Sequence, residues 1–161
     1  MARRESDRED ILREATALAE RVELKIPDFE EPVVVGFRRE GAASVFFGAD
    51  PVCQFNTAGE LRRAYVGGLL YKAERGRLVA LRRERTATEV ALIRRELDDA
   101  ETKALLTDLE SHLSRLKVAF SQNSLAVVGQ VPSDMDIIGR VSLWLDSLPP
   151  RIAVAAMPNV R

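Results

Sequence analysis

Residues 61–85 read LRRAYVGGLLYKAERGRLVALRRER, and this stretch decides the fold. Two residue pairs, Gly67-Gly68 and Arg75-Gly76, divide it into three segments that mix apolar and basic residues. Each pair can supply the positive φ angles that a two-residue hairpin loop requires. The stretch therefore predicts three consecutive antiparallel strands joined by tight turns.

Chain reversal at these two turns gives the three strands one largely apolar face and one mixed, basic face. The expected pairs on the apolar face are Val66–Leu69, Ala64–Tyr71, Ala73–Leu78 and Tyr71–Ala80. The expected pairs on the basic face are Arg63–Lys72, Glu74–Arg77 and Tyr65–Leu70. A short helix over 58–66 is the alternative, because Thr57 and Glu60 match a capping box and the following apolar residues keep helical spacing.

Upstream of this stretch, the sequence continues the same strand pattern. Three segments, 33–39, 44–47 and 52–55, are apolar and are separated by breaks that contain glycine, proline or asparagine. They extend the predicted antiparallel meander to about 33–85. Before it, Ser6 or Asp7 can cap a helix whose apolar stripe recurs at three and four residues as far as about Glu23.

Downstream, the pattern changes to helical spacing. Apolar residues predict two helices over 87–120, and Asp98-Asp99 marks the expected break between them. The last part reads as strand, helix and strand, from Leu125–Val128 through Pro132–Leu148 to Ile152–Ala156, which fits a right-handed crossover. The fold class expected is α+β, a single domain over 1–161 in which an N-terminal helix and a helical pair pack on the meander.

The composition narrows the class of protein. The 161 residues are 46% hydrophobic, carry a formal net charge of −1 and include one cysteine. A near-neutral chain is not a general polyanion binder, and a lone cysteine suits a reducing compartment. The charged N-terminus lacks the apolar core of a secretory signal, and no stretch is long enough to cross a bilayer. We expect a soluble, cytoplasmic protein without membrane contact.

Positive charge is concentrated on the three strands predicted over 61–85. Residues 57–95 contain ten basic and four acidic side chains, whereas both ends of the chain are acidic. Cations that neutralise phosphates and an aromatic ring that stacks on an unpaired base are typical of nucleic-acid surfaces. The first hypothesis is a non-catalytic binding or assembly module that contacts nucleic acid or an acidic partner through Arg63, Tyr65, Lys72, Arg77 and Arg83. The competing interpretation is an ordinary solvated strand face.

A loop near the C-terminus supplies the second hypothesis. If the crossover forms, the loop from Gly129 to Asp134 lies between a strand and a helix N-terminus, where free N–H groups can hold an anion. Gly129, Gln130 and Ser133 are the residues that would bind it. An anion or small molecule held there would define a binding domain, or an enzyme, although the loop lacks the glycine-rich run of a phosphate loop.

Other chemically active residues have simpler explanations. His112 is the single histidine and Cys53 the single cysteine, and one of each is too few for a zinc site. Cys53 lies in an apolar strand, and Asp98-Asp99 fits a helix cap. We therefore expect no cofactor, no metal and no catalytic residue. The leucine stripe within 88–120 is wide enough to cover the sheet and to leave part of its surface for a homodimer.

Overall fold

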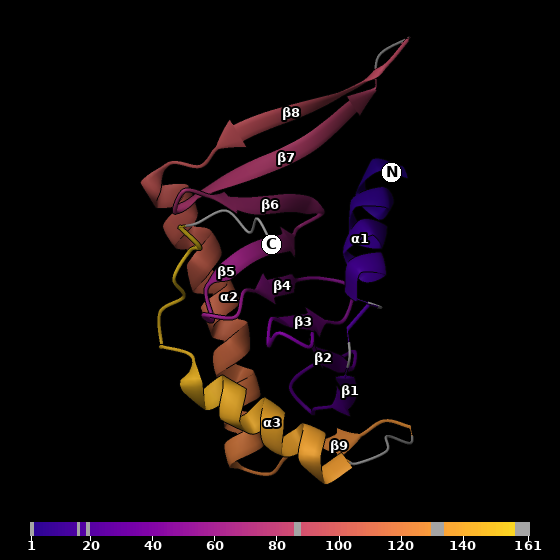
Figure 1. Cartoon of the computed structure of the whole chain (residues 1–161), viewed down its shortest axis with the longest axis vertical. Helices are drawn as coiled ribbons and strands as arrows, with labels where there is room; N and C mark the ends of the chain where they lie inside the picture. The colour runs from indigo at the N-terminus through magenta and orange to yellow at the C-terminus, as the bar shows by residue number, and fades with distance from the viewer. Residues whose placement is uncertain (1, 16, 19, 86–87, 130–133, 157–161) are drawn as a thin grey trace.

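The computed structural model of the chain describes residues 2–15, 17–18, 20–85, 88–129 and 134–156. These residues form three helices and one nine-stranded antiparallel sheet with the order β8-β7-β6-β5-β4-β3-β2-β1-β9 (Figure 1). The fold class is α+β with a β-meander, as the sequence predicts. The elements are α1 (Ala2–Ala15), β1 (Glu20–Lys25), β2 (Val33–Phe37), β3 (Ala43–Phe47), β4 (Val52–Phe55), β5 (Leu61–Val66), β6 (Leu69–Glu74), β7 (Arg77–Arg85), β8 (Val90–Glu96), α2 (Asp99–Ser121), β9 (Ala126–Val127) and α3 (Asp134–Ser147).

The two predicted turns and the registers they set are confirmed. Gly67 and Gly68 have φ of 61° and 82°, and Arg75 and Gly76 have φ of 55° and 81°, which is the backbone of a two-residue hairpin loop. All the pairs expected on both faces of β5, β6 and β7 occur in the sheet, from Val66–Leu69 to Glu74–Arg77. The helical alternative for 58–66 is therefore wrong.

The N-terminal helix is shorter than its apolar stripe suggested. α1 ends at Ala15, and the residues that follow form β1. In β1 the side chains alternate, with Val22 and Leu24 buried while their neighbours are exposed. Val22 therefore fits two patterns, the helical spacing of three and four residues from Ile11 onward and the strand alternation that it shares with Leu24. Pairing with β2 decides between them, since it satisfies the backbone of an otherwise lone strand.

The expected pair of helices over 87–120 is wrong in its first half. Residues Val90–Glu96 form β8, which pairs with β7 along its whole length. α2 is a single helix that begins where the break was expected. The Asp98 carboxylate accepts a hydrogen bond from the Glu101 N–H at 2.8 Å, and the Glu101 carboxylate accepts one from the Asp98 N–H at 3.0 Å. This capping box fixes a helix start, not a kink between two helices.

The C-terminal strand and helix are present as β9 and α3, but no crossover forms. β9 pairs antiparallel with β1 at one edge of the sheet, whereas Val154 makes a single parallel bridge to Leu61 in β5. The Leu61 N–H donates to the Ala153 carbonyl at 2.8 Å, and the Ala155 N–H donates to the Leu61 carbonyl at 2.9 Å. The last described segment is thus a short clasp on β5, four strands away from β1 in the sheet order.

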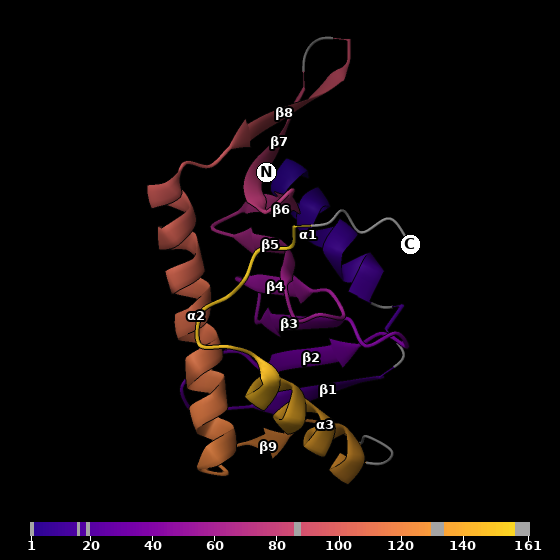
Figure 2. The same cartoon turned by 60° about the vertical axis from the view of Figure 1, so that its left-hand side comes forward.

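Each face of the sheet has its own core. On one face, α2 and α3 cover the larger core, to which α2 contributes Leu105, Leu109, Leu113 and Leu116 (Figure 2). On the other face, Ile11 and Ala15 of α1 pack on a smaller core made by residues of β3 to β6. Because these leucines of α2 are buried against the sheet, this stripe is not offered to a second subunit.

The two faces are not covered equally. The nine strands, about 4.8 Å apart, span about 38 Å. α2 has 23 residues, or about 35 Å of helix, whereas α1 has 14 residues, or about 21 Å. α2 therefore crosses nearly the whole sheet and α1 only part of it. The β7–β8 hairpin extends beyond both helices (Figures 1 and 2).

No helix among the described residues is long and apolar enough to span a membrane.

Replacing Leu109 by alanine should lower the free energy of unfolding by about 2–5 kcal/mol, because the leucine is 0% exposed and its loss leaves a cavity between α2 and the sheet. Urea unfolding followed by circular dichroism measures this. The matched control is Leu143→Ala on α3, where the leucine is 74% exposed and the change should stay within about 0.5 kcal/mol. Equal losses in the two variants would contradict the assignment of the core.

Candidate functional site: a basic groove beside α1

A β-bulge directs two consecutive arginines to the same face of the sheet. Between β4 and β5, Phe55 pairs with Leu61 but Gln54 pairs with Arg63, so Arg62 is the extra residue on β5. Side chains normally alternate along a strand, and a bulge interrupts that alternation and re-aims a side chain. Leu61 is buried, whereas Arg62 and Arg63 both reach the carboxylate of Glu14 on α1.

Glu14 joins α1 to the sheet. Its Oε1 lies 2.6 Å from Nη2 of Arg62 and 3.2 Å from Nη2 of Arg38, and its Oε2 lies 2.6 Å from Nη2 of Arg63. Burial alone would raise the pKa of Glu14, but the attraction of Arg63, Arg62 and Arg38 outweighs it and holds that pKa below its ordinary value. Burial likewise lowers the pKa of Arg63, against the opposing effect of Glu14. The carboxylate is thus ionised and shared by three guanidinium groups.

A polar chain continues from this cluster into the sheet. Nε of Arg63 donates to Oε1 of Gln54 at 2.7 Å, and Nε2 of Gln54 donates to Oγ of Ser44 at 3.4 Å. Gln54 and Ser44 are 2% and 4% exposed. Buried polar groups are costly without partners, so this chain explains how polar residues persist under α1 and why Arg63 has a fixed position.

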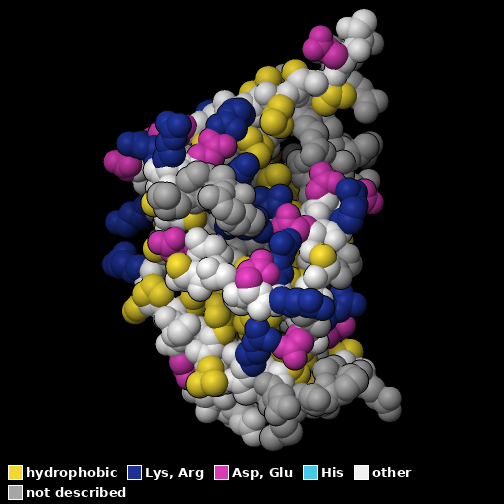
Figure 3. All heavy atoms as spheres, in the orientation of Figure 1, with side chains coloured by type: hydrophobic (Ala, Val, Ile, Leu, Met, Phe, Trp, Pro, Cys, Tyr) yellow, Lys and Arg dark blue, Asp and Glu magenta, His cyan; other side chains and the backbone are white. Residues whose placement is uncertain are grey.

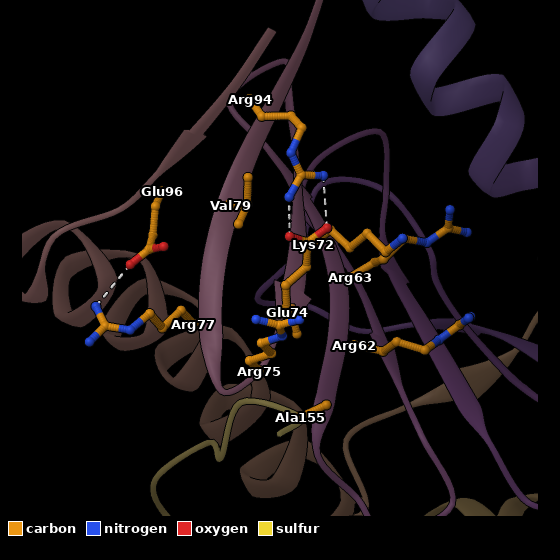
Figure 4. A pocket seen from close by; sticks show the side chains of 11 residues that line it. Arg62, Arg63, Lys72, Glu74, Arg75, Arg77, Val79, Arg94, Glu96 and Ala155 are labelled. Atoms are coloured by element: carbon orange, nitrogen blue, oxygen red, sulfur yellow. Dashed lines mark hydrogen bonds and ion pairs between the residues drawn. The ribbon is translucent and has the colours of Figure 1, made fainter. Parts of the chain in front are cut away.

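Beside α1, the sheet forms an open groove of about 1010 Å³ (Figure 4). Its lining comes mainly from β5 to β8, and the described part of it contains six cationic side chains against two acidic ones. The cations are Arg62, Arg63, Lys72, Arg75, Arg77 and Arg94, and the acids are Glu74 and Glu96. We call this surface the basic groove.

The two acids of the basic groove are already paired. Arg94 reaches across Val79 and donates both Nη atoms to Glu74, with the Nη1–Oε2 distance at 2.9 Å (Figure 4). The hydrogen bond from Arg94, the largest effect, holds the pKa of Glu74 below its ordinary value. Nη1 of Arg77 donates to Glu96 at 2.9 Å. Among the described residues, Lys72 and Arg75 have no ion pair within 4 Å.

An apolar strip adjoins the basic groove on the same face. A second hollow of about 400 Å³ is lined by Leu70, Leu81, Val90 and Leu92 together with Asp10 of α1, and it shares Arg63 and Lys72 with the basic groove. Val90 and Leu92 are 52% and 55% exposed. Figure 3 shows hydrophobic side chains along the projecting hairpin, close to Lys and Arg side chains. The groove therefore offers both charge and apolar area.

The structure brings together most of the residues that the sequence selected for this surface. Arg63, Lys72 and Arg77 line the basic groove. Tyr65 is on the expected face but is 5% exposed under α1, so it cannot stack on a base. The side chain of Arg83 lies outside the described residues. The basic face of the predicted strands was expected to be exposed to solvent. At β5 this is wrong, because α1 covers that part of the face.

Three residues that line the basic groove were not predicted from the sequence as binding residues. Arg62 was not selected from the sequence, and the bulge directs it to the same face as Arg63. Arg94 was placed in a helix, and it reaches the groove because β8 is a strand. Arg75 was taken only as a turn residue. The doubled arginine at 62–63, next to the asparagine and glycine turn at 56–59, is the one signal that could have indicated a bulge.

The loop of the second hypothesis loses its geometric support. Gly129 has φ of 76°, but Gln130 and Ser133 lie outside the described residues. The preceding strand, β9, is an antiparallel edge strand of two residues, so the loop is not at the carboxyl end of a parallel strand. The rule that places ligands at such ends does not apply here.

The described residues contain no group of three or more His, Cys, Asp or Glu side chains that could hold a metal ion. Cys53 is fully buried, and burial raises the pKa of its thiol, so the reactive thiolate is suppressed. His112 packs against the rings of Phe29 and Phe47, which also contact each other, and its Nδ1 lies 2.8 Å from the Asp108 carbonyl oxygen. These residues have structural roles.

Comparison with protein-family models, with curated proteins and with solved structures gave no significant match. Function must therefore be inferred from the geometry of the basic groove, the apolar strip and the sheet edge.

Replacing Glu14 by glutamine should lower the free energy of unfolding at neutral pH by about 1–3 kcal/mol, because three arginines lose their shared carboxylate. Because the pKa of Glu14 is lowered in the folded state, this stabilisation is complete at a pH above about 4.3, the usual pKa of glutamate. It is lost as the pH falls through the lower pKa of the folded state. Urea unfolding at several pH values should show the gap between wild type and variant closing in acid. Glu23→Gln on β1, where the side chain is exposed, should show neither effect, and a gap that is independent of pH would contradict the cluster.

Proposed function

We propose that the protein is a non-catalytic binding module that docks an acidic, partly apolar segment of another protein in the basic groove. The observation that carries this proposal is the convergence of six cationic side chains beside the apolar strip of Leu70, Leu81, Val90 and Leu92. Carboxylates are the natural partners of the guanidinium groups, and apolar side chains of the same segment suit the strip.

A protein segment fits this surface better than a nucleic acid does. Single-stranded nucleic acid is usually held by cations together with exposed aromatic rings, and none of the described residues that line either hollow is aromatic. The strip of leucines and valine has no counterpart in a phosphate backbone, whereas it matches the alternate side chains of a peptide.

A carboxylate of an incoming segment can replace the acids that already pair with arginines in the basic groove. The side chains of Arg77 and Arg94 are 64% and 50% exposed, and ion pairs at such exposure contribute little to stability. An incoming carboxylate can therefore replace Glu74 or Glu96 as a partner. Lys72 and Arg75 meet the segment without having to give up an ion pair, so they are the residues on which binding should depend most.

Selection from a displayed library of random peptides tests the proposal. Peptides should be selected on the wild-type protein and counter-selected on Lys72→Glu/Arg75→Glu. Both residues are exposed, so the double variant should keep its fold. We expect the retained peptides to combine Asp or Glu with Leu, Ile or Phe.

Fluorescence anisotropy of a retained peptide then measures the effect. Reversing two charges should weaken binding about tenfold or more, and added salt should weaken it further. Lys25→Glu on β1, distant from the groove in strand order, is the matched control and should change little. Retained peptides without acidic residues, or equal binding to the double variant, would refute the proposal, and so would tighter binding of an unstructured oligonucleotide at the same site.

A further inference from the structure

β8 is the edge strand of the sheet next to the basic groove, and no other described element pairs with its outer side. It has seven residues, whereas β9 at the opposite edge has two. Val90, Leu92 and Ile93 are 52%, 55% and 39% exposed, so apolar side chains stand in solvent on both faces of the strand. A long edge whose first four residues are uncharged is a ready template for another strand.

The backbone of β8 is arranged for such pairing. The Leu97 N–H donates to the Leu78 carbonyl at 2.9 Å, in line with the register in which Val79 opposes Glu96. In an antiparallel ladder, residues facing the neighbouring strand alternate with residues whose N–H and C=O point away. Counting back from Leu97, the groups of Val90, Leu92 and Arg94 point outward from the sheet.

We propose that β8 pairs antiparallel with β8 of a second copy of this chain, with Leu92 opposite the same residue of the partner subunit. A two-fold axis normal to the sheet relates the strands, so opposing residues are separated by an even number of positions. In this register, Glu89 of each copy faces the partner's Arg95, at both ends of the pair. Ala91 faces the partner's Ile93.

Charge selects this register over its neighbours. A shift by two residues in one direction puts Glu89 opposite the partner's Ile93, and a shift in the other direction puts it opposite the partner's Leu97. Both leave the carboxylate against an apolar side chain. The chosen register instead gives two opposite-charge pairs, with Arg95 also bound to Glu101 of its own chain at 2.9 Å. It forms about six backbone hydrogen bonds and brings the two Leu92 side chains side by side.

Leu92→Cys tests both the contact and its register. Two cysteines that face each other across adjacent strands lie within the Cα separation that a disulfide needs. Mild oxidation should give a covalent dimer on a non-reducing gel, and Cys53 cannot contribute because it is buried. Leu143→Cys, at a leucine on α3 that is even more exposed, should remain monomeric under the same oxidant.

Light scattering coupled to size exclusion gives the non-covalent measurement. The wild type should be a dimer at high micromolar concentration, and Leu92→Lys should be monomeric, because two like charges would meet on the axis. Leu143→Lys should stay dimeric. Both leucines are exposed, so neither change should disturb the fold, and thermal unfolding verifies this.

A charge swap tests the register independently of the axis. Glu89→Lys and Arg95→Glu alone should each weaken the dimer, whereas the double variant should restore it, because each reversed charge then faces its opposite on the partner. A monomeric wild type, a dimer unaffected by Leu92→Lys, or a double variant weaker than both single variants would overturn the proposal. None of these readouts depends on peptide binding, so this proposal and the docking proposal fail separately.

Discussion

The sheet has two apolar faces, and the length of the helix that covers each face decides which residues remain at the surface. α2 spans about 35 Å, which nearly matches the width of nine strands, so the face beneath it is covered except at the projecting β7–β8 hairpin, where Ile93 is 39% exposed. α1 spans about 21 Å and lies over the middle strands of the other face. The basic groove and the exposed side of β8 are the part of that face which α1 does not reach. The candidate surfaces therefore follow from unequal coverage.

The Glu14 cluster fixes α1 on the sheet. α1 contributes two fully or largely buried apolar residues, Ile11 and Ala15, which is a small contact for a helix. The shared carboxylate adds a fixed point beside Arg62 and Arg63, and the bulge in β5 is what brings both arginines to it. These two arginines also line the basic groove. One helix residue thus both anchors α1 and reduces the positive charge at the inner end of the groove, which leaves Lys72 and Arg75 as the dominant cations.

The sequence was sufficient where local chemistry decides structure. Gly67-Gly68 and Arg75-Gly76 fix their own turns, and the turns fix the register, so Arg63 and Lys72 could be paired without coordinates. The sequence was insufficient where contact with a distant segment decides the secondary structure. Val22 fits a helical stripe and an alternating strand equally well, and only β2 selects the strand. Residues 90–96 likewise become a strand because β7 is long enough to pair with them. The burial of Tyr65 depends on α1, a contact between segments some fifty residues apart in the chain, which no pattern within either segment records.

The two proposed surfaces are coupled by their geometry. A two-fold axis normal to the sheet keeps the α1 faces of both copies on the same side, so the paired strands would place two basic grooves on one continuous face. Arg94 lines each groove, and it would lie opposite the partner's Val90, so the two positive surfaces approach each other and oppose pairing. An acidic segment in either groove relieves that repulsion. By thermodynamic linkage, a segment that favours the dimer must bind the dimer more tightly than the monomer. A segment with two acidic stretches would gain further, because binding in one groove raises its effective concentration at the other.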